Sequence, residues 1–224
     1  MYDMVFISYT EPNAEDNWTK LKRRFPLAKR VHGVKGIHQA HIEAAKKSLT
    51  KMFWVIDGDA EILDTFEFNF RTKQCDTVYV WRSKNPINDL EYGNGGVKLL
   101  PKFLTLKMRT DTTDMTTSIS DKFVPVKEVS NVTAFNSDPF NTWKSAFREC
   151  CKLASKTIDR QKVDETELRL STWLTKGQDR LYGNHAINGA KDGIEFVKNN
   201  MYDPTLLKKI NDFDFLRELF KKYE

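Results

Sequence analysis

The chain has 224 residues, enough for one domain with its own core or for one domain with a small helical extension. Its composition, 40% hydrophobic, 30% charged and 12% aromatic, is that of an ordinary globular protein and excludes disordered and collagen-like chains. The net charge of +5 permits a polyanionic partner without requiring one.

Targeting and redox signals are weak in this sequence. No apolar run approaches the ~20 residues that a membrane-spanning helix needs, and the N-terminal segment lacks the pattern of a signal peptide. We therefore predict a cytoplasmic protein with no membrane partner. Cys150 and Cys151 are adjacent and Cys75 stands alone, so neither a disulfide framework nor a zinc spacing is present.

The first quarter of the chain has the pattern strand, loop, helix, strand, helix. An apolar run at 4–8 predicts a strand, and the amphipathic spacing over 16–24 predicts a helix. Residues 28–31 predict a second strand, and the loop 32–36 leads into a helix over 37–48. Basic pairs in this region indicate solvated helix faces, with nucleic-acid contact as the less common alternative.

A nearly continuous apolar run over 51–56 predicts a strand that is buried on both faces. Residues 77–81 predict another strand, and a glycine-rich turn at 94–96 leads into a further apolar segment. This alternation predicts an α/β fold in which a sheet is flanked by helices and ligands bind at the carboxyl ends of the strands. From Phe140 onward the pattern is mainly helical, and we predict a single domain over 1–224.

An acidic pair follows the buried strand directly. Asp57 and Asp59 are separated by Gly58, which permits a close turn. Oxygen ligands of this kind suit Mg²⁺ or Mn²⁺, because such an ion is held by one or two carboxylates and completes its shell with substrate phosphates. An acidic cap of a turn is the simpler alternative, but the position at the end of a buried strand favours the metal.

A strand that ends in Asp-x-Asp, in a chain that begins strand, loop, helix, resembles the GT-A glycosyltransferases. The resemblance implies a Rossmann-like mixed sheet and transfer of a sugar from a nucleotide-diphosphate donor, here a UDP-sugar. It implies that Asp57 approaches the donor ribose, or the metal through water, and that Asp59 binds Mn²⁺ or Mg²⁺. Residues 1–135 would then bind the nucleotide-sugar, and 136–224 would form the acceptor side.

The same resemblance extends to the loop after the first strand, where GT-A proteins hold the nucleobase and ribose. It implies donor contacts for Ser8, Tyr9 and Glu11, with Gly36 and Gln39 entering the pocket from the next helix. A surface aromatic residue beside a proline turn explains Tyr9 equally well.

The segment Asn-Gly-Gly-Val-Lys-Leu-Leu, which begins at Asn94, resembles the sugar-pocket segment of the glycogenin-like and lipopolysaccharide galactosyltransferase families. Gly95 and Gly96 would let the backbone approach the donor closely, and the asparagine amide offers both a donor and an acceptor to hydroxyls. A plain turn at the start of a strand is the alternative.

His185 and Lys191 resemble the late His-x-x-Gly-x-x-Lys element of the same families, which implies that His185 is the third metal ligand and Lys191 contacts the diphosphate. The spacing departs from the family, because Gly189 comes four residues after His185 and Lys191 two residues later. Neutral imidazole is a reasonable ligand for Mn²⁺, and a lysine offsets charge on leaving phosphates. A lone histidine is, however, more often a surface or core residue.

The catalytic carboxylate has several candidates. Asp164 and Glu165 resemble the Asp-Gln element of the galactosyltransferases, and Asp138 and Glu167 are further choices. Inverting enzymes need such a general base for the acceptor hydroxyl, whereas retaining enzymes often show none. Acids at the start of a helix, which favour its dipole, are the alternative for Asp164 and Glu165.

Compact, aromatic-rich sequences of this kind resemble enzymes of large tailed bacteriophages that glycosylate 5-hydroxymethylated pyrimidines. That resemblance implies double-stranded DNA as acceptor, with a base flipped out of the stack. Lipopolysaccharide and protein acceptors remain open. A Mg²⁺-dependent nucleotidyltransferase is a second class, although a third acid and a glycine-rich triphosphate loop are missing, and a catalytically inert nucleic-acid-binding module is a third. The sequence does not set the oligomeric state.

Overall fold

The computed structural model describes the chain except for residues 1, 94, 113, 157–162 and 202. The chain divides into two compact units. The first comprises Met1–Asn85 and Glu91–Ala134, and the second comprises Pro86–Leu90 and Phe135–Glu224. In the described part of the chain, no helix is long and apolar enough to cross a membrane.

The first unit is built on a mixed sheet with the strand order β2-β1-β3-β7-β5-β8-β4, in which β6 pairs with β5. Strands β2, β1 and β3 are parallel, β7 is antiparallel to both β3 and β5, and β8 is parallel to β5. The bounds are β1 (Asp3–Ser8), β2 (Lys29–His32), β3 (Met52–Asp57), β4 (Ala60–Ile62), β5 (Val78–Lys84), β6 (Glu91–Tyr92), β7 (Val97–Pro101) and β8 (Phe123–Thr133).

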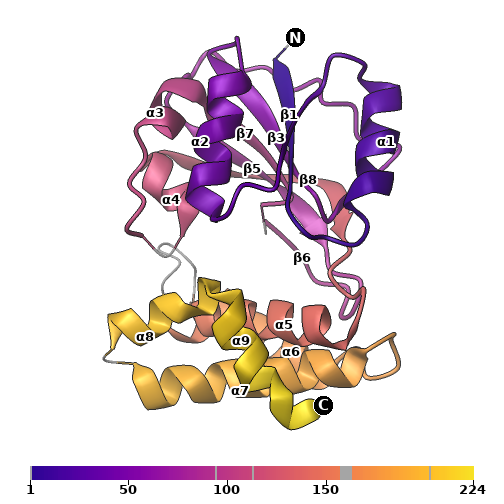
Figure 1. Cartoon of the computed structure of the whole chain (residues 1–224), viewed down its shortest axis with the longest axis vertical. Helices are drawn as coiled ribbons and strands as arrows, with labels where there is room; N and C mark the ends of the chain where they lie inside the picture. The colour runs from indigo at the N-terminus through magenta and orange to yellow at the C-terminus, as the bar shows by residue number, and fades with distance from the viewer. Residues whose placement is uncertain (1, 94, 113, 157–162, 202) are drawn as a thin grey trace. The chain divides into compact units, whose positions relative to one another are not determined.

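Helices cover both faces of this sheet (Figure 1). Helix α1 lies on one face, and α2, α3 and α4 lie on the other. Their bounds are α1 (Ala14–Arg24), α2 (Ile37–Lys47), α3 (Lys102–Leu106) and α4 (Met115–Ile119). The predicted α/β class, a mixed sheet flanked by helices, is therefore confirmed.

Strand β3 is the centre of the core, as its apolar sequence predicts. Its side chains from Met52 to Ile56 have no exposed surface. Because successive side chains point to opposite faces, Phe53 and Val55 pack toward α2 while Trp54 packs on the α1 side. There the Trp54 and Trp81 rings lie 4.6 Å apart between their centroids. The end of β3 is thus held rigidly from both faces.

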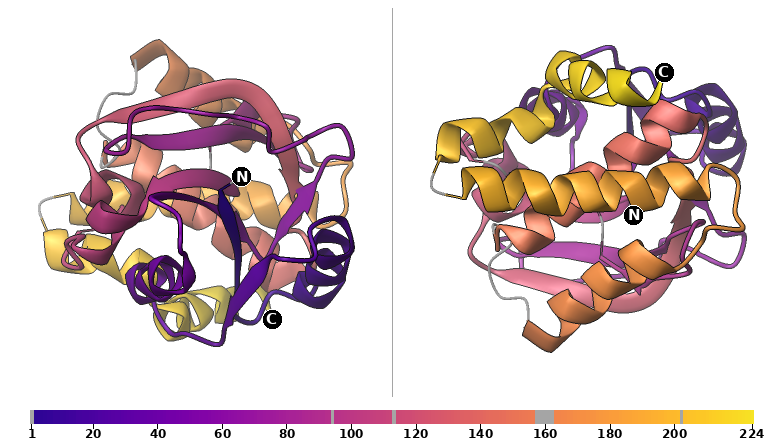
Figure 2. Two further views of the ribbon diagram at one scale, coloured as in Figure 1. Left: turned by 90° about the horizontal axis from the view of Figure 1, so that it is seen from above. Right: turned by 90° about the horizontal axis from the view of Figure 1, so that it is seen from below.

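The second unit is helical. Asp138 caps α5 by accepting a hydrogen bond from the backbone N–H of Asn141 at 2.7 Å. Figure 2 (right) shows α7 running across this unit. The elements are α5 (Pro139–Ala154), α6 (Val163–Thr175), α7 (Gly183–Asn200), α8 (Pro204–Lys208), η1 (Lys209–Asn211), α9 (Phe213–Phe220) and η2 (Lys221–Tyr223).

Glycines let α7 approach α5 closely. A methyl group on Gly189 would lie 2.3 Å from the carbonyl oxygen of Trp143, and one on Gly193 would lie 2.4 Å from that of Phe147. Neither position has room for a side chain, so the two helix backbones are in direct contact. Gly189, which family resemblance assigned to a ligand-binding element, has a packing role here.

Candidate active site

The acidic pair lies at the carboxyl end of β3, beside the glycine turn. Asp57 is the last residue of the strand, and its backbone N–H donates to the carbonyl of Gly96 at 2.9 Å. Because β7 is antiparallel to β3, its first residues lie at the same edge of the sheet as the last residues of β3. The structure therefore brings the two predicted elements together.

Glu11 joins this pair from the loop after β1. A methyl group on Gly58 would lie 2.8 Å from Glu11 Oε2 and 3.1 Å from the Cβ of Ser8, so the glutamate carboxylate packs directly on the turn between the aspartates. The backbone N–H of Tyr9 donates to the same Oε2 at 2.7 Å. Three carboxylates thus lie together at the carboxyl ends of strands β1 and β3.

Lys98 is a buried cation in this site that sequence reasoning missed. Its Nζ lies 2.8 Å from each carboxylate oxygen of Asp57 and also donates to the carbonyl of Gly95. The lysine side chain is 2% exposed and that of Asp57 is 31% exposed. The available signal was a lysine inside the apolar run that follows Gly96.

The carboxylates repel each other. Burial raises the pKa of Asp57, although the ammonium of Lys98 opposes this shift. Burial, together with the charges of Asp57 and Glu11, raises the pKa of Asp59 to about 7. Lys98 neutralises Asp57, whereas Glu11 and Asp59 form no ion pair within the described part of the chain. The turn therefore holds surplus negative charge that a cation would relieve.

A preformed metal centre is absent from the described residues, where no group of three or more His, Cys, Asp or Glu side chains is arranged to hold an ion. Asp57 and Asp59 offer two carboxylates at the turn, which suit an ion that takes its other ligands from water and substrate phosphates. His185 belongs to the second unit, so the predicted metal set of Asp57, Asp59 and His185 stays a prediction.

Ser8 lies at the carboxyl end of β1 but points into a polar network. Its buried hydroxyl lies 3.0 Å from His32 Nδ1 and accepts from Arg30 Nε at 3.0 Å. Arg30 in turn donates to both carboxylate oxygens of Glu15. Tyr9, the next residue along, is exposed. This network orders the ends of β1 and β2 next to the acidic turn.

The remaining predicted donor contacts of the first unit lie at the surface or at the glycine turn. Gly36 has a φ of 92° and open space where a side chain would stand. Gln39 is exposed and donates to Glu43 at 2.8 Å. Gly95 has a φ of 86°, in the region that favours glycine. Asn94 lies outside the described residues.

Gly96 rests on a buried polar cluster that the sequence did not reveal. A methyl group on Gly96 would lie 2.6 Å from Asn131 Nδ2. The Asn131 side chain accepts from Ser130 Oγ at 2.8 Å and donates to Ser83 Oγ at 3.1 Å. Since these groups are buried and paired, they fix the position of the turn.

The other predicted site residues belong to the second unit. His185 lies on α7, with its ring centroid 6.2 Å from that of Phe220, and Lys191 is exposed on the same helix. Asp164 and Glu165 are exposed in the first turn of α6. Of the two further candidates for the catalytic carboxylate, Asp138 caps α5 and Glu167 is exposed on α6.

Comparison with known proteins gives remote similarities of fold. No protein-family model matches the sequence, and no curated protein matches it. HddC from Yersinia pseudotuberculosis is similar in structure, with 15% identity, coverage of 58% of this chain and 90% of HddC, and a TM-score of 0.36. The mannosyltransferase PcManGT from Pyrobaculum calidifontis was solved in complex with GDP-Man and Mn²⁺. It is 12% identical to this chain, the match covers 99% of this chain and 88% of PcManGT, and the TM-score is 0.43.

Proposed function

We propose that this chain is a metal-dependent glycosyltransferase of the GT-A type, which moves a sugar from a nucleotide-diphosphate donor to a hydroxyl group. The observation that carries the proposal is the gathering of Glu11, Asp57 and Asp59 at the carboxyl end of the buried central strand. Ligands of open α/β sheets bind at that edge. The glycine turn at 95–96 lies beside the acids, because the backbone N–H of Asp57 donates to the carbonyl of Gly96.

Asp59 and Asp57 are the residues that would hold Mn²⁺ or Mg²⁺. The fit rests on charge, because Asp59 has no ion-pair partner in the described part of the chain, and burial together with the charges of Asp57 and Glu11 raises its pKa to about 7. A bound divalent ion supplies charge stabilisation for the departing diphosphate. His185 and Lys191 are proposed to add a third ligand and a phosphate contact, on the strength of the family resemblance alone.

The protein's own groups orient this site. Lys98 fixes the Asp57 carboxylate through two contacts of 2.8 Å, so Asp57 cannot rotate freely toward solvent. The carboxylate of Glu11 packs against the backbone of Gly58 and so limits movement of the turn. Tyr9 is exposed and would stack on a nucleobase. Asp164 and Glu165 are proposed as the acceptor-side acids.

The finer proposal concerns donor and acceptor. We propose a UDP-sugar as donor and a 5-hydroxymethylated pyrimidine in double-stranded DNA as acceptor, acting in the cytoplasm of a phage-infected host. The support is the resemblance to phage enzymes and the net charge of +5, which suits a polyanion.

The test is calorimetric titration of the purified chain with UDP, GDP, UDP-glucose and GDP-mannose, with and without Mn²⁺. We expect one diphosphate to bind only when Mn²⁺ is present, and Asp59→Asn to abolish that binding. The matched control is Asp64→Asn, because Asp64 is an exposed acid outside the turn. It is expected to bind as the unchanged chain does.

Each outcome decides between the functional classes. Metal-dependent binding of a diphosphate, lost in Asp59→Asn and kept in Asp64→Asn, supports sugar transfer, and hydroxymethylated DNA is then the first acceptor to assay. Binding of a nucleoside triphosphate with Mg²⁺, but of no diphosphate, replaces the proposal with nucleotidyl transfer. Binding of no nucleotide at all rejects both.

A further inference from the structure

The edge of the first unit's sheet opposite the acidic turn collects exposed apolar side chains and lysines. Strands β1, β2 and β3 begin at this edge, α1 and α2 end there, and α3 begins there after β7. Figure 2 (left) looks onto it from the side on which Figure 1 places the N-terminus. We call it the basic edge, defined by Leu27, Lys46, Lys47, Leu49, Lys51, Lys102, Phe103 and Lys107.

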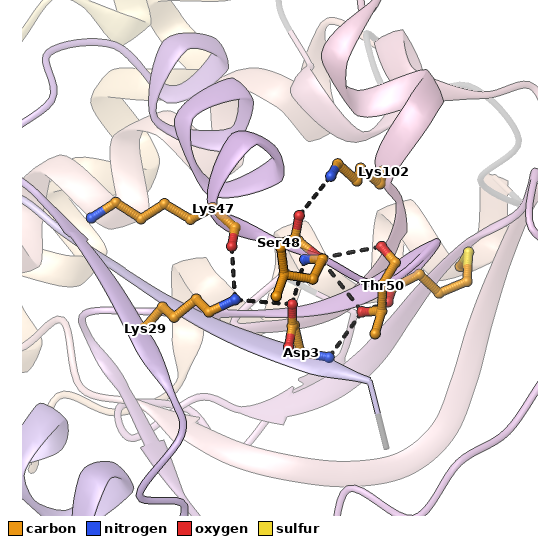
Figure 3. A network of polar contacts seen from close by, with 8 residues as sticks. Asp3, Lys29, Lys47, Ser48, Thr50 and Lys102 are labelled. Carbon is orange, nitrogen blue, oxygen red and sulfur yellow. Dashed lines mark hydrogen bonds and ion pairs between the residues drawn. The ribbon is translucent and has the colours of Figure 1, made fainter.

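Polar contacts join the segments of this edge into one surface (Figure 3). Lys29 at the start of β2 pairs with Asp3 at 3.1 Å and donates to the carbonyl of Lys47 at 2.8 Å. Lys102 at the start of α3 donates to the carbonyl of Ser48 at 2.6 Å. Because these lysines bond the last carbonyls of α2 and the residue after it, they hold the helix end and α3 together.

The apolar side chains of the basic edge point into water. Leu27 is 90% exposed, Leu49 is 85% exposed and Phe103 is 63% exposed. The ammonium of Lys107 lies 4.2 Å from the centroid of the Phe103 ring. Exposed apolar side chains gathered on one surface and surrounded by polar groups mark an interaction site.

The charge of the basic edge is positive. Its acidic neighbours are already neutralised, because Asp3 pairs with Lys29 and Glu43 pairs with Lys46. The other lysines form no ion pair with any described residue, and these are Lys47, Lys51, Lys102 and Lys107. The partner of this surface must therefore offer both negative charge and an apolar environment.

We propose that the basic edge binds the surface of an anionic lipid bilayer. Lys51 and Lys107 would contact lipid phosphates, while Leu27, Leu49 and Phe103 would enter the boundary between headgroups and acyl chains. Nucleic acid satisfies the lysines but leaves the apolar side chains in water, and a second copy of this edge brings lysine against lysine. Such a contact needs no spanning helix, so it is compatible with the absence of one among the described residues.

The proposal goes beyond the proposed function and does not depend on it. The basic edge and the acidic turn lie at opposite ends of β3, a strand of six residues. At about 3.3 Å per residue, the two ends are about 17 Å apart. A bilayer on the basic edge therefore leaves the acidic turn open, and the chain is expected to bind vesicles and a nucleotide at the same time.

The experiment is co-flotation of the full chain with vesicles of phosphatidylcholine and phosphatidylserine, compared with vesicles of phosphatidylcholine alone. We expect binding to the anionic vesicles that weakens as salt is raised. Lys51→Gln and Lys107→Gln should each weaken it about fivefold, and Leu49→Ser and Phe103→Ser about tenfold each.

The matched control for Phe103→Ser is Leu168→Ser, because Leu168 is also 63% exposed but lies in the second unit. Leu168→Ser should float as the unchanged chain does, and all variants should keep its melting temperature because the altered side chains are exposed. Equal binding to both kinds of vesicle, or to neither, overturns the proposal. The surface is assigned to nucleic acid instead if the chain binds duplex DNA and no vesicles, and if Lys51→Gln weakens the DNA binding while Leu49→Ser leaves it unchanged.

Discussion

Replacement of Lys98 by methionine tests the ion pair at the centre of the candidate site. Methionine has nearly the length of lysine and no charge, so Lys98→Met removes the ammonium with little change in packing. The variant leaves the Asp57 carboxylate without its cation and the carbonyl of Gly95 without its donor.

The magnitude follows from burial. Removing one partner of a fully buried pair costs about 3–5 kcal/mol, because the other charge stays behind without compensation. Since Asp57 is 31% exposed, water compensates part of the loss, and we expect Lys98→Met to lower the free energy of unfolding by about 2–4 kcal/mol. Lys20, whose pair with Glu61 is exposed on both sides, provides the matched control, and Lys20→Met should cause no measurable loss.

The assay is urea unfolding at neutral pH of Lys98→Met, Asp57→Asn and the double variant. Because Asp57→Asn removes the charge that Lys98 neutralises, the double variant should lose about 1.5–3 kcal/mol less than the sum of the single variants. A coupling that cannot be distinguished from zero, or a Lys98→Met variant as stable as Lys20→Met, would refute the reasoning that the buried ammonium holds Asp57.

Three further predictions concern stability. Burial and the nearby charge of Lys98 lower the pKa of His41 well below its usual value, so only the unfolded chain binds this proton. The free energy of unfolding should then fall as the pH is lowered below 6.5, and it should be ~1.4 kcal/mol smaller at pH 5.5 than at neutral pH. In urea titrations at neutral pH and at pH 5.5, His41→Leu should remove that part of the pH dependence. Gly96→Ala should cost about 1–3 kcal/mol because its methyl group meets the buried Asn131 amide, whereas Gly93→Ala, with its nearest contact at 3.5 Å, should melt as the unchanged chain does. Burial acts to raise the pKa of Asp3, but the N–H of Leu49 and the ammonium of Lys29 outweigh it and lower this pKa below 3.8. Asp3→Asn should therefore lower the free energy of unfolding by about 1 kcal/mol at neutral pH, and by progressively less as acid titrates the carboxylate. A loss that stays constant with pH contradicts this.

The first half of the fold was accessible from local patterns. The apolar run at 51–56 predicted β3 (Met52–Asp57), and the spacings over 16–24 and 37–48 predicted α1 and α2 within a few residues of their bounds. Such segments carry their own signal, because the side chains that face the core recur with the period of the element. The buried strand with its acidic end followed from the same reasoning.

Among the elements that the sequence did not single out, α7 and β8 have clear physical reasons. Helix α7 (Gly183–Asn200) lies in the part predicted to be mainly helical, but its glycines and asparagines lower helix propensity, and family resemblance assigned Gly189 to a ligand-binding element. They are needed where α7 contacts α5, which no local pattern reveals. Strand β8 (Phe123–Thr133) is mostly exposed or half-buried along its first part and contains Pro125, so its sequence lacks the apolar run of a central strand.

The candidate site was accessible only in part. Asp57 and Asp59 stood out because two acids follow a buried strand, and the turn at Gly96 stood out by composition. The partners of these residues did not, because Lys98 meets Asp57 through the pairing of β3 with β7, and Asn131 meets Gly96 from β8, a distant part of the sequence. The residues of α6 and α7 that family resemblance suggested remain predictions.

Lys98 forms an ion pair with Asp57 but not with Asp59, so the two aspartates should contribute differently to binding a metal ion. Asp57 is held by an ammonium on both of its oxygens, whereas Asp59 has acidic neighbours and no ion pair in the described part of the chain. A divalent cation therefore gains more from Asp59 than from Asp57, which it shares with Lys98. We expect Asp59→Asn to abolish Mn²⁺-dependent binding of a nucleoside diphosphate in calorimetry and Asp57→Asn only to weaken it. Equal loss in both variants would mean that the ion displaces Lys98 from Asp57, and unchanged binding in Asp59→Asn would remove the metal from this turn.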